Sequence, residues 1–169
     1  MIKLNCVIDT SAALSLFSTG KFKLATKFFS FFSPGKVKDE LIEMSKTSDK
    51  IGNIANNILK SSLIKIINLA KEFQNNRGEI EVINLANKLK ADLILMDDIQ
   101  ATKKLQRQCN IKIRFSPFVI FVLCEKNIIT YKDGLSAIEE MKTKREWQEN
   151  LIIEYAQMLL ENLMEENKL

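Results

Sequence analysis

The chain has 169 residues, of which 46% are hydrophobic, so it has the size of one domain that can bury a core without disulfide staples. It contains no histidine, which excludes a Ser-His-Asp or Cys-His hydrolase, a histidine-ligated zinc or non-haem iron site, and imidazole acid-base catalysis. Any catalysis must therefore use carboxylates, lysines or a bound metal. The 25 Lys and Arg against 21 Asp and Glu make the chain mildly basic, which suits contact with phosphate without requiring it.

The predicted elements alternate between strands and helices. The first strand stops at Asp9, a residue that favours a helix N-cap, and Ser33 followed by Pro34 is typical of a helix start. In chain order we expect strand 3–8, helices 11–17 and 21–29, strand 28–32, helices 33–45 and 51–61, strand 63–69, helix 78–90, strand 92–96, helix 99–108, strand 111–115 and helices 118–125 and 132–144. This alternation predicts an α/β fold, a three-layer sandwich with a central, mainly parallel sheet covered on both faces.

Two acidic positions fall at the carboxyl edge of that sheet, where ligands bind in folds of this class. Asp9 ends the first strand, and Asp97 and Asp98 follow the strand over 92–96. Either aspartate alone could be only the cap of the next helix. Two such strand ends in one small domain favour a shared site.

Two glutamates lie on inward faces of predicted helices. Val37 and Met44 stand three residues before and four after Glu40, so Glu40 shares an apolar stripe, where an acid is costly unless a cation or hydrogen-bond donors meet it. Glu79 begins the core-facing stripe of its helix, whereas Glu81 is expected to face outward. The alternative for Glu79 is a first-turn acid that complements the helix dipole.

Asp9, Glu40, Glu79 and Asp97 thus form a set of four carboxylates without a histidine or a suitable cysteine beside them. Crowded carboxylates repel one another unless a hard cation neutralises them, and all-oxygen ligation selects Mg²⁺ or Mn²⁺. Such clusters commonly serve phosphoryl chemistry. We expect activity to follow the metal and the acids, without an imidazole that titrates near neutral pH.

Four segments carry a resemblance to a known family by their order and spacing. They are VIDTSA at 7–12, P-x-x-V-x-x-E-L at 34–41, G-E-x-E-x-I-x-L-A at 78–86 and ADLILMDD at 91–98. Over residues 4–130 the sequence resembles PIN-domain ribonucleases, close to the VapC-type toxins of toxin-antitoxin systems.

The resemblance implies a role for each acid. Asp9, Glu40, Glu79 and Asp97 are implied to be the catalytic, metal-binding acids, with Asp98 as a further metal ligand. The terminal acid of the family corresponds to either Asp97 or Asp98. Ser11 is implied to steady Asp9 through its hydroxyl.

The chain departs from the family pattern at two places near the predicted site. Thr102 stands where relatives with this Asp-Asp motif usually have arginine, and residues 115–118 replace a glycine-rich turn, which affects substrate positioning more than metal binding. Basic residues on the helix after the acids are candidate RNA contacts, with ordinary solvated surface charge as the alternative. They are Lys103, Lys104 and Arg107.

A helical extension over 145–169 is expected to follow a PIN-like domain over 1–144. Its pattern reads as one long helix over 145–168, whose stripe packs on the domain, forms a dimer seam or binds a partner. The stripe contains Trp147, Leu151, Tyr155, Leu159 and Leu163.

The three cysteines Cys6, Cys109 and Cys124 are far apart among apolar neighbours, which is typical of core residues in a reduced protein. The longest hydrophobic run, 118–124, is too short to span a bilayer, and the chain opens with no secretory signal. We expect a soluble, cytoplasmic protein with no membrane contact.

The sequence therefore predicts a Mg²⁺- or Mn²⁺-dependent endoribonuclease, a hydrolase of RNA phosphodiester bonds. The resemblance also implies the role of a toxin, and the expected partners are RNA, an antitoxin protein and a second copy in a homodimer. One alternative is a catalytically silent PIN-like module that binds RNA or protein. The other is that the acids are only helix caps and surface ion pairs.

Overall fold

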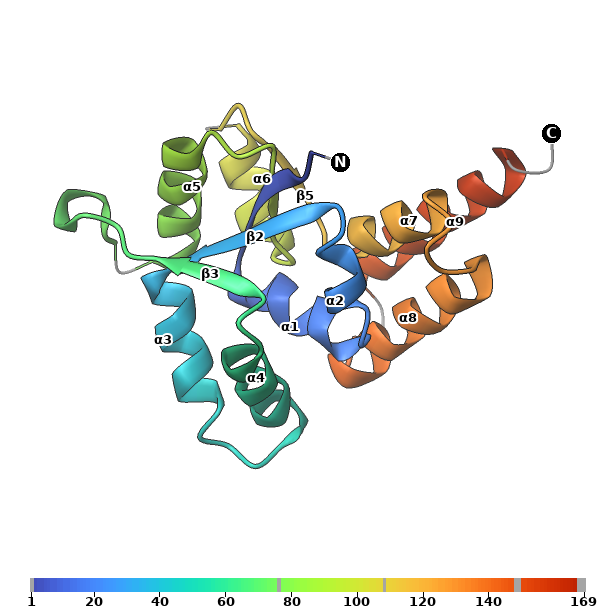
Figure 1. The fold of residues 1–169 in the computed structure, drawn as a ribbon, viewed down its shortest axis with the longest axis horizontal. Helices are drawn as coiled ribbons and strands as arrows, with labels where there is room; N and C mark the ends of the chain where they lie inside the picture. Colours follow the sequence, from blue (N-terminus) through green and yellow to red (C-terminus); the bar gives the residue numbers. More distant parts are fainter. Residues whose placement is uncertain (1, 76, 108, 148–149, 167–169) are drawn as a thin grey trace.

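The computed structural model describes residues 2–75, 77–107, 109–147 and 150–166. Strands alternate with helices up to β5, after which only helices follow in this part of the chain (Figure 1). In chain order the elements are β1 (Leu4–Ile8), α1 (Thr10–Ser18), α2 (Phe22–Ala25), β2 (Phe29–Pro34), α3 (Gly35–Met44), α4 (Lys50–Ser61), β3 (Ile64–Ile67), the 3₁₀ helix η1 (Lys71–Phe73), α5 (Gly78–Leu89), β4 (Leu93–Leu95), α6 (Ile99–Gln106), β5 (Lys112–Arg114), α7 (Pro117–Glu125), α8 (Tyr131–Lys144) and α9 (Leu151–Glu166).

The sheet has five parallel strands in the order β3-β2-β1-β4-β5. The chain adds β2 and β3 on one side of β1, then crosses over and adds β4 and β5 on the other side. This confirms the predicted α/β fold with a parallel sheet. The strand order reverses at β1, so the crevice outside the carboxyl ends of β1 and β4 is the place where such a sheet accommodates a ligand.

Helices cover both faces of the sheet. Figure 1 shows α1, α3 and α4 on one side of the strands and α5 and α6 on the other. The central strands are buried because helices cover both faces: β4 is buried at every residue, and β1 is buried over its last three. The three helices after β5 lie beside the first layer, where α7 contacts α2, α8 contacts α1 and α9 contacts both α7 and α8.

Two predicted boundaries near β2 are wrong. The helix expected over 21–29 ends at Ala25, because Phe29 and Phe31 belong to β2 and alternate into the core. The helix expected to start at Ser33 begins at Gly35 instead. Ser33 is fully buried within β2, and its hydroxyl donates a hydrogen bond of 2.6 Å to the Ile8 carbonyl oxygen rather than capping a helix.

The C-terminal segment differs from the predicted single helix. Helix α8 ends at Lys144 and α9 begins at Leu151, so the helix expected to start at residue 145 is interrupted. The buried stripe is also shifted, because Leu151 is 55% exposed while Ile152 is fully buried. Residues 148–149 and 167–169, like the end of the predicted helix 99–108 at residue 108, lie outside the described residues. The buried residues of α9 are Ile152, Ile153, Ala156, Leu160 and Leu163.

Cys6, Cys109 and Cys124 are all buried and free, in agreement with their interpretation as core residues. None of the described helices is both long enough and apolar enough to cross a membrane.

Candidate functional site

A cavity of about 290 Å³ opens at the carboxyl edge of the sheet, beside the reversal of strand order. Four acidic side chains line it, and each comes from a different part of the fold. Asp9 lies between β1 and α1, Glu40 on α3, Glu79 in the first turn of α5, and Asp98 between β4 and α6. The structure therefore brings four of the five predicted acids to one cavity.

Asp9 is held by donors on α1. Its side chain caps this helix by accepting a hydrogen bond of 2.7 Å from the Ala12 amide, and the Ser11 hydroxyl lies 2.9 Å from its Oδ2. The Asp97 amide in turn donates to the Ser11 hydroxyl oxygen at 3.1 Å. Ser11 thus connects the end of β1 to the segment after β4, and it occupies the supporting position that the resemblance implied.

Asp97 is the predicted acid that does not line the cavity. Its Oδ1 accepts from the Ser116 amide and its Oδ2 from the Ser116 hydroxyl, both at 2.7 Å. Ser116 is fully buried and precedes α7, in the segment where the chain departs from the glycine-rich pattern. The departure therefore supplies two donors to this carboxylate, a role that the sequence reasoning missed.

Asp98 caps α6 through the Ala101 amide, which donates to its Oδ1 at 2.8 Å. It is exposed and lines the cavity, whereas Asp97 is turned toward Ser116. The helix-cap interpretation is thus correct for Asp98 as it is for Asp9, but it does not account for the meeting of both residues at the cavity.

Glu40 is half-buried on α3, between Val37 and Met44 of its predicted apolar stripe, and all three residues line the cavity. The hydroxyl of Thr10, a buried residue, donates to its Oε2. Its Oε1 lies against Gly78, where an added Cβ would come within 2.8 Å of that oxygen. Neither neighbour was predicted from the sequence.

Glu79 is half-buried at the cavity, as the stripe of α5 predicted. The outward orientation expected for Glu81 is wrong, because this residue is only 6% exposed. The segment before α5 folds back over the start of that helix, so the Asn75 amide donates to the Glu81 Oε1 at 2.9 Å and the Asn84 side chain donates to the Phe73 carbonyl oxygen at 2.9 Å.

Burial raises the pKa of two carboxyl groups at the cavity edge. The pKa of Asp9 is raised to about 7, chiefly by burial; the charges of Asp97 and Glu40 add to this rise, and the donors from Ala12 and Ser11 oppose it. Burial also raises the pKa of Asp97, while the hydrogen bonds from Ser116 lower it. A cation placed between Asp9 and Asp97 would lower the pKa of both carboxyl groups. A carboxyl group, rather than an imidazole, therefore titrates near neutral pH in the metal-free site.

A basic residue from the C-terminal part of the chain also lines the cavity. Arg145 follows α8, and its guanidinium interacts electrostatically with Asp97 and Asp9. Burial lowers the pKa of this guanidinium and the two carboxylates raise it, so it stays charged at physiological pH. The sequence reasoning had included it in the tail helix.

The three predicted RNA contacts do not belong to the lining that the described residues form. Lys103 and Lys104 are exposed in the last turn of α6, and Arg107 is exposed just after it. Helix α6 begins at the acidic edge and runs back toward the start of β5, so these residues lie progressively farther from Asp98. Their contact with RNA stays a prediction.

The donor set fits a hard divalent cation. The acidic oxygens of Asp9, Glu40, Glu79 and Asp98 share the cavity, and the raised pKa of Asp9 reflects a place where negative charge lacks compensation. Among the described residues, no three His, Cys, Asp or Glu side chains are already gathered tightly enough to hold an ion. Thr10 and Ser116 hold Glu40 and Asp97 through hydrogen bonds instead.

Comparison with known proteins identifies the family. A family model described as PIN domain matches residues 5–162. No curated protein sequence matches the chain. The match begins at the second residue of β1 and includes the rest of the sheet, all the candidate acids and most of α9.

Proposed function

The chain belongs to the PIN-domain family, whose fold is of a nuclease type, and we propose that this protein is a Mg²⁺- or Mn²⁺-dependent endoribonuclease. The observation that carries the proposal is the convergence of Asp9, Glu40, Glu79 and Asp98 on one cavity at the carboxyl ends of β1 and β4, with Asp97 beside Asp9. Capping explains Asp9 and Asp98 singly, but it explains neither the glutamates nor the burial of Asp9.

The proposal assigns the metal to oxygens of Asp9, Glu40, Glu79 and Asp98, which line the cavity, and adds Asp97, which lies beside Asp9 with its oxygens held by Ser116. When bound, the metal would supply activation of a water and neutralisation of phosphate charge. Ser11 orients Asp9, Thr10 orients Glu40 and Ser116 orients Asp97. These three hydroxyls fix the carboxylates before substrate arrives, which reduces the reorganisation that the reaction requires.

The direct test incubates the purified chain with structured and unstructured RNA, with and without Mn²⁺. We expect cleavage that requires the metal and falls at least about 100-fold in Asp9→Asn, because a missing ligand affects both metal binding and the transition state. Asp49→Asn is the matched control, since Asp49 caps α4 in the same way but lies outside the acidic cavity. Undiminished cleavage in Asp9→Asn or after chelation overturns the mechanism.

The two neighbouring acids can be separated in the same assay. Asp97→Asn and Asp98→Asn each remove one candidate for the terminal ligand, and both variants can be compared for their Mn²⁺ requirement. Loss in both supports the assignment of both residues to the site. Full activity in one of them removes that residue from the metal-binding set.

We further propose the role of a toxin that acts on cytoplasmic RNA and is inhibited by an antitoxin protein. Expression of the chain alone should arrest growth, and co-expression of a small protein encoded next to it should relieve the arrest. Asp9→Asn should permit normal growth. Normal growth with active wild-type enzyme present would refute the toxin role and leave the nuclease proposal standing.

A further inference from the structure

Arg145 is the basic residue among the described residues that line the acidic cavity. Its charge is attracted by Asp97 and Asp9, yet no ion pair within 4.0 Å joins it to either carboxylate in the described part of the chain. A half-buried arginine that served only to neutralise the acids would be expected to pair with one of them directly.

The backbone at Arg145 is fixed by the end of α8. The Arg145 amide donates to the Met141 carbonyl oxygen and the Trp147 amide to the Lys142 carbonyl oxygen, both at 2.9 Å. Glu146 between them has a positive φ of 57°, so the helix ends in a Schellman motif. The Lys144 ammonium donates to the Ser18 carbonyl oxygen at 2.5 Å, which ties this helix end to α1.

The side chain of Arg145 has unused donor capacity inside the protein. Its guanidinium carbon lies 5.8 Å from the centroid of the Trp147 ring, a cation–π distance that orients the group. Its Nε is buried and has no hydrogen-bond partner among the described residues. Because buried donors are almost always satisfied, an unpaired one in a side chain that lines a cavity points to an acceptor that binds there and that the guanidinium turns to meet.

Arg145 also marks the junction of two cavities. A second cavity of about 600 Å³ shares Arg145 and Ile51 with the acidic one. Its other lining residues lie near the start of α4 and the end of α8, and they are Ser48, Asp49, Lys50, Asn53, Lys144 and Glu146. An anionic group at the acids would therefore meet Arg145, whereas the second cavity offers the carboxylates of Asp49 and Glu146 as well as lysines.

We propose that Arg145 is a phosphate-binding residue of the nuclease, which contacts the RNA strand at the acidic cavity. This inference rests on the proposed function, because it takes RNA as the substrate. A guanidinium matches phosphate through two parallel hydrogen bonds and keeps its charge at any physiological pH. Arg145 thereby supplies positive charge from the end of α8, whereas Lys103, Lys104 and Arg107 lie along α6 away from the acids.

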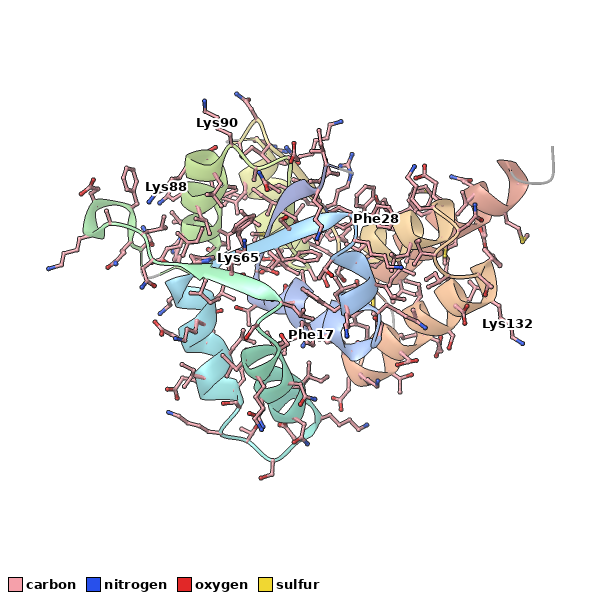
Figure 2. The ribbon with its side chains drawn as sticks, viewed as in Figure 1. Phe17, Phe28, Lys65, Lys88, Lys90 and Lys132 are labelled. Carbon is pink, nitrogen blue, oxygen red and sulfur yellow. The ribbon has the colours of Figure 1, made fainter. Side chains whose placement is uncertain are left out.

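The test measures affinity separately from cleavage. Binding of a short fluorescein-labelled single-stranded RNA in EDTA is followed by anisotropy over a range of salt concentrations. The variants are Arg145→Ala and Arg145→Lys, with Lys132→Ala as the control. Lys132 lies near the other end of the same helix, and Figure 2 shows its side chain pointing into solvent.

We expect Arg145→Ala to weaken RNA binding about tenfold or more, as the loss of a charge-assisted hydrogen bond does. The slope of log K against log salt should become shallower by about 0.7, the value for one phosphate contact on a single strand. Arg145→Lys should be intermediate, because it keeps the charge and loses the fork, and Lys132→Ala should match wild type.

Unchanged affinity and salt slope in Arg145→Ala overturn the inference, and so does an equal loss of affinity in Lys132→Ala. Weaker binding by Arg145→Ala with an unchanged salt slope and a lowered Tm also overturns it, because that combination is a purely structural effect. Absence of RNA binding by wild type also overturns it. If Arg145→Ala does not fold, Arg145→Lys and Arg145→Gln decide by the same two measurements. Metal-dependent cleavage that survives alongside unchanged binding refutes this inference alone, whereas Arg145-dependent binding without acid-dependent cleavage refutes only the proposed function.

Discussion

Asp9 and Asp49 begin their helices in almost the same way, but their carboxyl groups have opposite pKa shifts. The backbone angles are −83° and 174° at Asp9 and −84° and −178° at Asp49, and each side chain accepts a hydrogen bond of 2.7 Å from the amide three residues ahead. Burial raises the pKa of Asp9 to about 7, whereas the Gly52 amide and the Thr47 hydroxyl lower the pKa of exposed Asp49. The cap is the same and the surroundings differ.

The opposite pKa shifts of Asp9 and Asp49 distinguish a capping role from a functional one. A cap favours an exposed, ionised aspartate, because the helix dipole and the free amides stabilise negative charge. At Asp9 the carboxyl group is desolvated and faces the charges of Asp97 and Glu40, neither of which capping requires. A carboxyl group that lies in a cavity where its charged form is disfavoured is the pattern expected of a functional residue.

The largest expected effect is on the pH dependence of stability in the absence of metal. The folded pKa of Asp9 is about 7 and its reference value is 3.8, so the folded state binds the proton more tightly, and the free energy of unfolding falls as pH rises through this window. The full effect is on the order of 4 kcal/mol. Asp9→Asn should remove most of this fall, so it should be more stable than wild type at about pH 8 in EDTA.

Urea unfolding at about pH 5 and about pH 8 measures the difference. Some decline should persist in Asp9→Asn, because Asp97 also has a raised pKa and lies with Glu40 and Arg145 around the same position. Asp49→Asn should follow wild type in this window, since a lowered pKa contributes stability that is lost only when the pH falls below the usual aspartate range. Equal curves for Asp9→Asn and wild type would mean that Asp9 is a cap and nothing more.

The second effect is stabilisation by the metal itself. An ion that binds only the folded state raises the free energy of unfolding by about 2.7 kcal/mol at 100 times its Kd. Thermal unfolding with increasing Mn²⁺ should therefore show a rising Tm in wild type and in Asp49→Asn, and little or no rise in Asp9→Asn. A Tm that rises equally in all three proteins would place the ion elsewhere on the molecule.

The sequence was sufficient to predict the features that depend on one strand at a time. The apolar runs that end at Asp9 and at Asp97 predicted two strands. Parallel pairing brings the carboxyl ends of these strands to one edge of the sheet in any strand order. The stripe shared by Val37, Glu40 and Met44 likewise placed Glu40 at the cavity, because helical spacing alone decides which residues share a face.

The partners of the acids could not be predicted because they depend on how separate elements are placed. Thr10 was visible next to Asp9, but its contact with Glu40 requires the exact approach of α3 to α1. For Ser116 a signal existed, since it follows the predicted strand over 111–115 and so lies at the same carboxyl edge as Asp97.

Arg145 was missed for a different reason. Helix α8 ends without a glycine or proline, and Glu146 takes the left-handed conformation that glycine usually marks. The pattern of apolar residues therefore appeared continuous across the break. A helix end closed by a non-glycine residue has no reliable sequence signal, so the turn that brings Arg145 to the cavity emerges only from the structure.

The third effect concerns the Thr10 hydroxyl, which donates a hydrogen bond to one of the cavity acids. Thr10→Val removes the hydroxyl that donates to the Glu40 Oε2 and leaves the size of the side chain unchanged. The loss of a hydrogen bond to a charged group is worth about 2 kcal/mol, so metal-dependent cleavage should fall about thirtyfold. Thr10→Ser should restore most of it. Equal activity in Thr10→Val would show that Glu40 needs no orientation.

The smallest effect tests the other oxygen of the same carboxylate. In Gly78→Ala the new Cβ would lie 2.8 Å from the Glu40 Oε1, which ends a flexible side chain and can move aside. Stability should stay the same or rise by about 0.5 kcal/mol, because alanine restricts the unfolded chain more than glycine does. Cleavage should still fall about threefold to tenfold, since small displacements of a catalytic group lower the rate.

Gly134→Ala provides the opposite case. Its Cβ would come within 2.6 Å of the Cys124 sulfur, which is buried between α7 and α8 and away from the acids. This variant should lose stability by about 1 to 3 kcal/mol and keep its activity per folded molecule. If Gly78→Ala instead loses stability and activity together, Glu40 is a structural residue whose place at the cavity is incidental. If Gly78→Ala loses activity alone and Gly134→Ala loses stability alone, the positions of the acids affect cleavage independently of the stability of the fold. The difference between Asp9 and Asp49 already indicates this independence.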